Sequence, residues 1–255
     1  MISLQADLRR TFVILGLIAA LGMPARGQDM RRGVYTPPAA GTVRAIAEHG
    51  MVVAQEKIAA HVGADVLKRG GNAVDAAVAT GFAMAVTYPR AGNIGGGGFM
   101  VIHLAERHQD AAVDYRETAP AAITRDIFLG ADGKPDRTKS LDSALAIGVP
   151  GTVAGLALAL DRYGSGKFTL AELLKPAIAL ASDGITVADD LADTLEEGRE
   201  RLGHWPASLD MLLRDDGTPL REGDKLVQKD LAATLTAISE QGPRGFYQGP
   251  VAESW

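Results

Sequence analysis

The sequence contains no cysteine, which excludes disulfide bonds, thiolate zinc sites and cysteine nucleophiles. It has no run of about 20 apolar residues, the length that a helix needs to span a bilayer. The Gly-x-Ser-x-Gly motif of many serine hydrolases is also missing. The net charge of −5 argues against a polyanionic partner such as nucleic acid. What is present is a 47% apolar content, which is ample for a hydrophobic core.

The N-terminus has the pattern of a secretory signal peptide. Arg9 and Arg10 precede an apolar run over residues 12–23, and Ala25 and Gly27 supply the small residues of a cleavage site. A membrane anchor is the alternative, but the run is too short to span a bilayer. The arginine pair fits both twin-arginine export and an ordinary positively charged leader. We expect a signal peptide over residues 1–27, a linker over 28–45, one domain over 46–255, and a periplasmic or secreted protein.

Helices dominate the pattern of the mature chain. Apolar periodicity and capping residues predict a short strand at 51–54 and a β-hairpin of strands 99–105 and 111–115. Asn72 should cap the second helix, and Thr169 with Glu172 forms a capping box at the fourth. The helix at 72–85 is rich in alanine on nearly all sides, which predicts burial on more than one face. Predicted helices occupy residues 58–66, 72–85, 153–163, 169–182, 187–201, 208–213 and 228–241. A short turn of helix is also predicted at residues 124–129.

Four consecutive glycines, Gly95, Gly96, Gly97 and Gly98, precede the hairpin. Such a run is useful where the backbone must approach another group closely or adopt a positive φ. A phosphate cradle is the competing interpretation, but the run is not Gly-x-Gly-x-x-Gly, and no lysine with serine or threonine follows it. We therefore predict that the glycines pack against a substrate pocket or a neighbouring segment.

Arg116, at the end of the second hairpin strand, is the strongest candidate for substrate binding. Its planar guanidinium can grip a carboxylate through two parallel hydrogen bonds and stays charged at any working pH. Strand alternation places Asp114 on the same face, where it could hold the guanidinium in position. A purely structural Asp114–Arg116 pair is the alternative.

Other polar residues offer weaker chemistry. His103 and His108 flank the hairpin turn and could share a metal, but no carboxylate pattern completes a ligand set, so we assign no metal site. The segment Gly164–Lys167 superficially resembles the end of a P-loop, yet Phe168 stands where a magnesium-binding Ser or Thr is required, so a helix-ending turn is expected. Thr152 should lie at a helix N-terminus and not act as a nucleophile.

The chain carries seven short motifs, Gly71–Ala77, Asn93–Met100, Asp114–Pro120, Gly148–Thr152, Gly223–Asp224, Gln228–Ala232 and Gly245–Gly249. Taken together, in this order and at this spacing, they resemble those of the γ-glutamyltranspeptidases. The resemblance extends from about Gly50 to Trp255. It implies an α+β fold that is part of the four-layer α-β-β-α arrangement of N-terminal-nucleophile hydrolases. It also implies that residues 46–255 are an incomplete large subunit that stops before the small one.

The resemblance implies a zymogen that cuts itself to expose the N-terminal threonine of its small subunit. That threonine attacks a γ-glutamyl amide such as glutathione, with its own amino group as the base, and the acyl group passes to water or an amino-acid acceptor. The Thr-[Ser/Thr/Ala]-His motif that begins the small subunit does not occur in this sequence. No catalytic residue is therefore assigned, and this chain alone is expected to be inactive. The resemblance assigns to Arg116 the binding of the α-carboxylate of the γ-glutamyl group.

Two alternatives remain open for function. One is the related acylase branch, which cleaves glutaryl or β-lactam side-chain amides. The other is a non-catalytic exported binding fragment that keeps the carboxylate clamp. No cofactor is expected, and the expected partners are a γ-glutamyl donor, an acceptor and the missing small subunit.

Overall fold

The computed structural model describes residues 46–214 and 216–254. The predicted signal peptide and the linker up to residue 45 lie outside these described residues. Within them, no helix is both long enough and apolar enough to cross a membrane.

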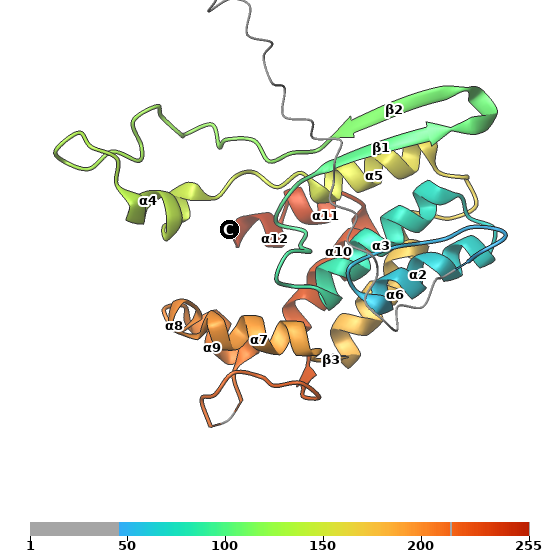
Figure 1. Cartoon of the computed structure of the whole chain (residues 1–255). Coiled ribbons are helices and arrows are strands. Elements are labelled where there is room, and N and C mark those ends of the chain that lie inside the picture. Colours follow the sequence, from blue (N-terminus) through green and yellow to red (C-terminus); the bar gives the residue numbers. More distant parts are fainter. Residues whose placement is uncertain (1–45, 215, 255) are drawn as a thin grey trace, which may run out of the picture. The chain divides into compact units, whose positions relative to one another are not determined.

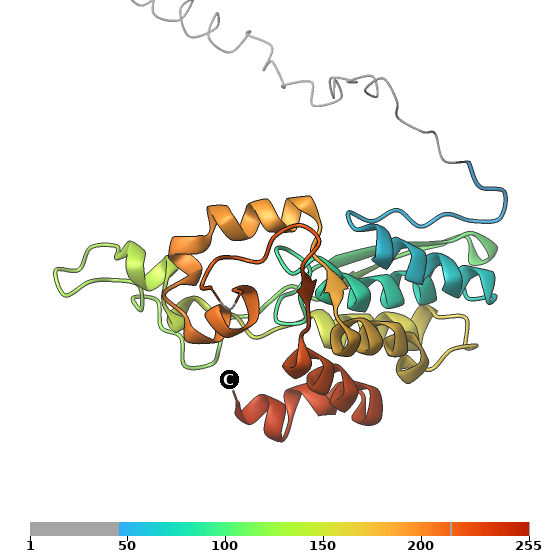
Figure 2. The same ribbon diagram turned by 90° about the horizontal axis from the view of Figure 1, so that it is seen from below.

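Helix α3 (Ala73–Thr87) lies at the centre of the fold. It packs against α2 (Lys57–Lys68), α5 (Thr152–Tyr163) and α6 (Leu170–Asp183), and α6 in turn packs against α10 (Lys229–Gln241), as Figures 1 and 2 show. Small residues let these helices approach closely: a Cβ added to Gly81 would lie 3.1 Å from Leu156 Cδ1. Most side chains of α3 are buried on all sides. The predicted burial of this helix on more than one face is confirmed.

The N-cap predicted at Asn72 and the capping box predicted at Thr169 are confirmed, and Asn72 also forms a capping box, with Asp75. Asn72 Oδ1 accepts hydrogen bonds from the backbone N–H groups of Val74 and Asp75, and Asp75 Oδ2 accepts one from Asn72 N at 2.8 Å. Asp75 is fully buried, and its Oδ1 also accepts from Ser165 N at 3.1 Å. Because buried carboxylates are costly unless hydrogen-bonded, Asp75 ties the 164–167 turn to the start of α3. Thr169 and Glu172 form the second box at α6.

The hairpin is present as predicted. Strands β1 (Phe99–Leu104) and β2 (Gln109–Asp114) pair antiparallel with Phe99 opposite Asp114, and the 3-10 turn η1 (Ala105–Arg107) joins them. Ile102 and Val113 face the core and are buried. Helix α5 runs beneath this covered face (Figure 1). The opposite face carries Phe99 and Val101, whose exposed fractions are 66% and 82%.

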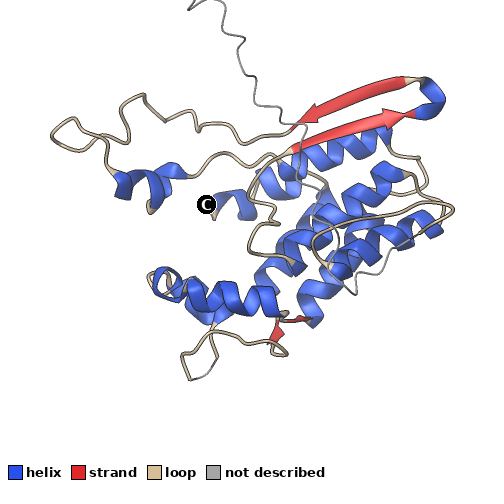
Figure 3. Ribbon diagram, in the orientation of Figure 1, coloured by secondary structure: helices blue, strands red, loops and turns tan. Residues whose placement is uncertain are grey.

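The remaining elements are short (Figure 3). The predicted helix over residues 187–201 is divided at Gly198 into two. The short turn of helix predicted at 124–129 is not formed; the segment makes two hydrogen-bonded turns instead, from Ile127 N to Thr124 O and from Leu129 N to Asp126 O. The other helices predicted from the sequence are confirmed. Strands β3 and β4 pair antiparallel, with Ile185 opposite Leu226. These elements are α4 (Arg137–Leu141), η2 (Ala144–Ala146), β3 (Ile185–Thr186), α7 (Asp189–Glu197), α8 (Arg199–Leu202), α9 (Pro206–Leu212), β4 (Lys225–Leu226), α11 (Arg244–Tyr247) and α12 (Pro250–Glu253).

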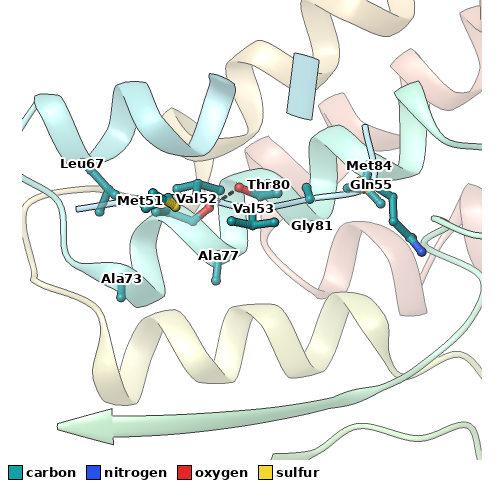
Figure 4. A pocket seen from close by; sticks show the side chains of 12 residues that line it. Met51, Val52, Val53, Gln55, Leu67, Ala73, Ala77, Thr80, Gly81 and Met84 are labelled. Carbon is teal, nitrogen blue, oxygen red and sulfur yellow. Dashed lines mark hydrogen bonds between the residues drawn. The ribbon is translucent and has the colours of Figure 1, made fainter. Parts of the chain in front are cut away.

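The strand predicted at residues 51–54 is not formed. The chain is extended there, with Met51 and Val53 exposed and Val52 half-buried, but none of the described strands pairs with it. A strand needs the N–H and C=O groups of a neighbour to complete its ladder. The segment instead borders a groove of about 570 Å³ against the small residues of α3 (Figure 4). The residues that line this groove include no charged side chain, so it offers no ionic partner to a ligand.

Candidate functional site

The glycine run lies between α3 and β1, and its backbone packs against the backbone of residues 115–117. Gly98 extends the hairpin ladder by one pair, because Tyr115 N donates to Gly98 O at 3.0 Å and Gly98 N donates to Tyr115 O at 3.3 Å. A Cβ on Gly97 would lie 2.5 Å from Tyr115 O and 2.7 Å from Glu117 N. None of Gly95 to Gly98 has a positive φ. Close approach to a neighbouring segment, and not an unusual φ, therefore explains why a glycine stands at position 97.

A second glycine-containing turn, residues 148–152, holds the same segment from another side. The N–H groups of Gly151 and Thr152 both donate to Gly96 O, at 2.8 and 3.0 Å. Val149 N donates to Thr118 O at 2.8 Å. A Cβ on Gly148 would lie 2.9 Å from the Cβ of Glu117. The backbone that carries Arg116 is thus fixed between the glycine run and this turn.

Arg116 itself reaches solvent from this rigid base. Its side chain is 67% exposed, and its Nε lies 3.5 Å from Glu117 Oε2. The Oε2 atom is buried and accepts no hydrogen bond from the described residues. The negative charge beside the guanidinium is therefore that of Glu117, while the exposed guanidinium remains accessible to a carboxylate ligand.

Asp114 does not hold the guanidinium, contrary to the sequence-based expectation. Its Oδ1 accepts a hydrogen bond from the backbone N–H of Arg116 at 3.0 Å. A short Asp side chain readily bonds the backbone two residues ahead, and this local bond competes with a longer-range ion pair. Asp114 therefore shapes the strand end, and the contact with the guanidinium comes from Glu117.

A pocket of about 350 Å³ opens beside Arg116. Arg116 and Glu117 supply its charged side chains, and Ile123, Phe128 and Ile147 supply much of its apolar wall. A larger pocket of about 970 Å³ lies next to it and shares Pro120, Ile147 and Gly148. Its wall includes Gly95 of the glycine run and Tyr247 of α11. Arg116 thus lines the smaller of two adjoining pockets and is the cation available there to an anionic ligand.

The weaker candidates have structural roles. His103 Nδ1 lies 2.7 Å from Asp110 Oδ1 across the hairpin, while His108 adopts a positive φ of 47° in the turn. Among residues 46–214 and 216–254, no three His, Cys, Asp or Glu side chains gather in a way that could hold a metal ion. Helix α5 ends at Tyr163 with Gly164 as its C-cap, so the 164–167 segment is a helix-ending turn as predicted. Within this segment, Lys167 Nζ donates to Gly70 O at 2.8 Å. Thr152 is the first residue of α5, also as predicted.

Comparison of the sequence with known proteins identifies the family of this chain. Residues 59–255 match the sequence profile of the γ-glutamyltranspeptidase family. The chain belongs to the γ-glutamyltranspeptidase family. It is 51% identical over 208 residues to the glutathione hydrolase proenzyme of Escherichia coli (strain K12), covering 81% of this chain and 35% of that relative. It therefore spans about a third of the length of that curated relative.

Solved structures of the family show the same fold. The chain resembles the γ-glutamyltranspeptidase of Helicobacter pylori with a TM-score of 0.80 and 45% identity, covering 83% of this chain and 60% of that one. It also resembles a cephalosporin acylase from Bacillus halodurans, with a TM-score of 0.68 and 26% identity, covering 86% of this chain and 42% of that one. The predicted α+β fold class is confirmed.

Sequence reasoning missed two residues of this candidate site. Glu117 was overlooked because strand alternation directed attention to Asp114, which shares a face with Arg116. The signal for Glu117 lay in its neighbours, since glycines at positions 97 and 148 leave room for its side chain. Tyr247 lies far along the chain from the site, and only the fold brings it to the 148–152 turn.

Proposed function

We propose that this chain is the N-terminal, large-subunit portion of a γ-glutamyltranspeptidase. In the complete protein, a threonine outside this chain attacks the γ-carbonyl carbon of glutathione or a related amide, and the amine leaves with a proton supplied by the threonine's amino group. Water or an amino-acid amine then attacks the resulting ester and frees the threonine hydroxyl. The single observation that supports the role of this chain is the exposed Arg116 guanidinium on a rigid backbone beside a pocket.

Arg116 is the proposed binding group for the α-carboxylate of the γ-glutamyl donor. The glycines Gly95 to Gly98 support it by allowing the backbone to pack against the strand end, and Asp114 supports it through the Arg116 N–H. A guanidinium can hold a carboxylate through two parallel hydrogen bonds, which a lysine cannot match. This geometry favours a donor whose acyl group ends in a carboxylate. The γ-glutamyl group and the glutaryl group of the acylase alternative both do, so the choice between them is left to the test that follows.

The test uses a completed precursor, made by joining this chain to the remaining C-terminal part of the Escherichia coli proenzyme. We expect it to cleave itself and to release p-nitroaniline from γ-glutamyl-p-nitroanilide faster than from glutaryl-p-nitroanilide. The 255-residue chain alone is the matched control and should release none, because its sequence contains no Thr-[Ser/Thr/Ala]-His motif. Preference for the glutaryl donor would favour the acylase. Absence of turnover in a folded, self-cleaved precursor would favour the non-catalytic binding fragment.

We also propose that the exposed face of the hairpin packs against the small subunit. Phe99 and Val101 lie side by side on this face, and neighbouring apolar residues of this size are seldom left uncovered in a stable monomer. Such a strand pair also tends to recruit other chains through its edges. We expect the isolated chain to self-associate, and we place the complete protein in the periplasm or outside the cell.

Self-association of the isolated chain should depend on the hairpin. Replacing Phe99 and Val101 together by lysine puts charge on the exposed face, which disfavours edge-to-edge pairing. Light scattering coupled to size exclusion should show a larger monomer fraction for this variant. Leu158→Lys is the matched control, because Leu158 is also exposed but lies on α5. A monodisperse parent chain with a sharp cooperative melt would contradict the proposal.

A further inference from the structure

The Tyr247 hydroxyl links α11 to the start of α5. It donates a hydrogen bond to Pro150 O at 2.9 Å and accepts one from Ala154 N at 3.2 Å. The Ala154 N–H belongs to the first turn of α5, whose N–H groups have no partner within the helix. Burial raises the pKa of Tyr247, so the hydroxyl keeps its proton and remains a donor at working pH. The hydroxyl therefore satisfies a carbonyl and an amide on the two sides of one turn.

The 148–152 turn, to which Tyr247 is hydrogen-bonded, also contacts the segment that carries Arg116. Immediately after Pro150, the Gly151 and Thr152 N–H groups bond to Gly96 O. Gly151 lies so close to Tyr115 O that a Cβ there would overlap it. Immediately before Pro150, Val149 pairs with Thr118. Arg116 therefore lies between two residues, Tyr115 and Thr118, that this turn contacts directly.

We propose that Tyr247 is a positioning residue for the carboxylate clamp, acting through the 150–152 turn on Arg116. Tyr247 contributes to the wall of the larger pocket, but its hydroxyl is used on the backbone and not offered to a ligand. The inference rests on the proposed function, because it supposes that Arg116 binds the α-carboxylate of the donor.

The first test is Tyr247→Phe in the completed precursor. Phenylalanine keeps the ring, which packs edge-on against Phe246 with centroids 5.0 Å apart, and removes only the hydroxyl. Losing a neutral hydrogen bond changes an equilibrium by about two- to tenfold. We expect the Michaelis constant for γ-glutamyl-p-nitroanilide to rise by about that factor, with little change in kcat. The rise should be much smaller for 4-aminobutyryl-p-nitroanilide, which keeps the amino group but lacks the α-carboxylate. Tyr163→Phe, at the other end of α5, is the matched control and should change neither constant.

A double-mutant cycle with Arg116→Lys separates positioning from a general structural effect. If Tyr247 acts through Arg116, then Tyr247→Phe should have little further effect once the guanidinium is gone, so the two changes will not be additive. Additive losses, or equal losses on both donors, would show that Tyr247 only stabilises the fold. If Arg116→Lys is donor-selective and Tyr247→Phe is not, this inference alone fails. If Arg116→Lys lacks selectivity, the proposed clamp fails and the inference fails with it.

Discussion

Replacing Arg116 by lysine should weaken binding of γ-glutamyl donors to the completed precursor by about one to two decades. Lysine keeps the positive charge but loses the planar fork that matches a carboxylate through two parallel hydrogen bonds. Hydrogen bonds to charged groups contribute roughly 1.5–3 kcal/mol each, which sets the size of the expected loss. The loss should appear mainly in the Michaelis constant for γ-glutamyl-p-nitroanilide, because the clamp holds the donor in its ground state and transition state alike.

A donor without the α-carboxylate decides whether this loss reports on a carboxylate clamp. 4-Aminobutyryl-p-nitroanilide keeps the amino group but lacks the α-carboxylate and therefore never uses the proposed contact, so Arg116→Lys should alter its Michaelis constant much less. Arg107→Lys is a matched control, because Arg107 lies at the far end of the same hairpin, in the η1 turn. Equal losses on both donors would mean that Arg116 has a structural role, in the ion pair with Glu117 that lies 3.5 Å away.

Local features of this fold could be predicted because the partners of each side chain lie a few residues away. Asn72 with Asp75, and Thr169 with Glu172, are three residues apart, so both capping boxes are visible in the sequence. The hairpin was equally accessible, since its strands alternate and a polar turn separates them. The extended segment at 51–54 shows the limit of this reasoning. Its residues suit a strand, but a strand forms only when a neighbour supplies the other half of the ladder.

The candidate site was only partly predictable, because its geometry depends on contacts between distant segments. Arg116 could be chosen from its chemistry and place in the strand, but its ionic neighbour could not. Alternation favoured Asp114, while the local bond of Asp114 to the Arg116 N–H and the space left by Gly97 and Gly148 favour Glu117. The bond from Tyr247 to Pro150 spans 97 residues and has no local signature.

The role of the glycine run was also only partly predictable from the sequence. Its sequence allows either close backbone approach or positive φ, and we predicted close packing against a substrate pocket or a neighbouring segment. The structure shows close approach, and it places another glycine, Gly155 of α5, directly against the Tyr115 ring. Burial raises the pKa of the Tyr115 hydroxyl, in keeping with a ring held in the interior beside α5. Helix α5 and the strand end that carries Arg116 therefore meet at a contact that has no room for a Cβ.

Gly155→Ala should consequently destabilise the completed precursor, although the same change usually favours a helix. In a helix interior, alanine is normally more stable than glycine by about 0.8–1 kcal/mol. At position 155 the added Cβ would overlap Tyr115 Cβ and Cγ and lie 2.6 Å from Cδ1. Overpacking of this kind costs about 1–3 kcal/mol and occasionally more. All three of these atoms belong to the Tyr115 side chain, so we place the cost at the upper end of this range. The clash should therefore outweigh the gain in helix propensity.

Thermal unfolding and soluble yield of the completed precursor provide the measurement. We expect Gly155→Ala to lower both, and to raise the Michaelis constant for γ-glutamyl-p-nitroanilide, because Tyr115 cannot move without displacing the adjacent Arg116. Gly198→Ala is the matched control. Gly198 ends α7 with a right-handed φ of −86°, and the nearest atom to its added Cβ is Thr194 O of its own helix at 3.1 Å. That variant should melt within a degree or two of the parent, since a surface change of this kind typically stays within about 0.5 kcal/mol. A Gly155→Ala precursor that melts at or above the parent would show that α5 and the strand end can separate without cost, and that the site is less rigid than its contacts indicate.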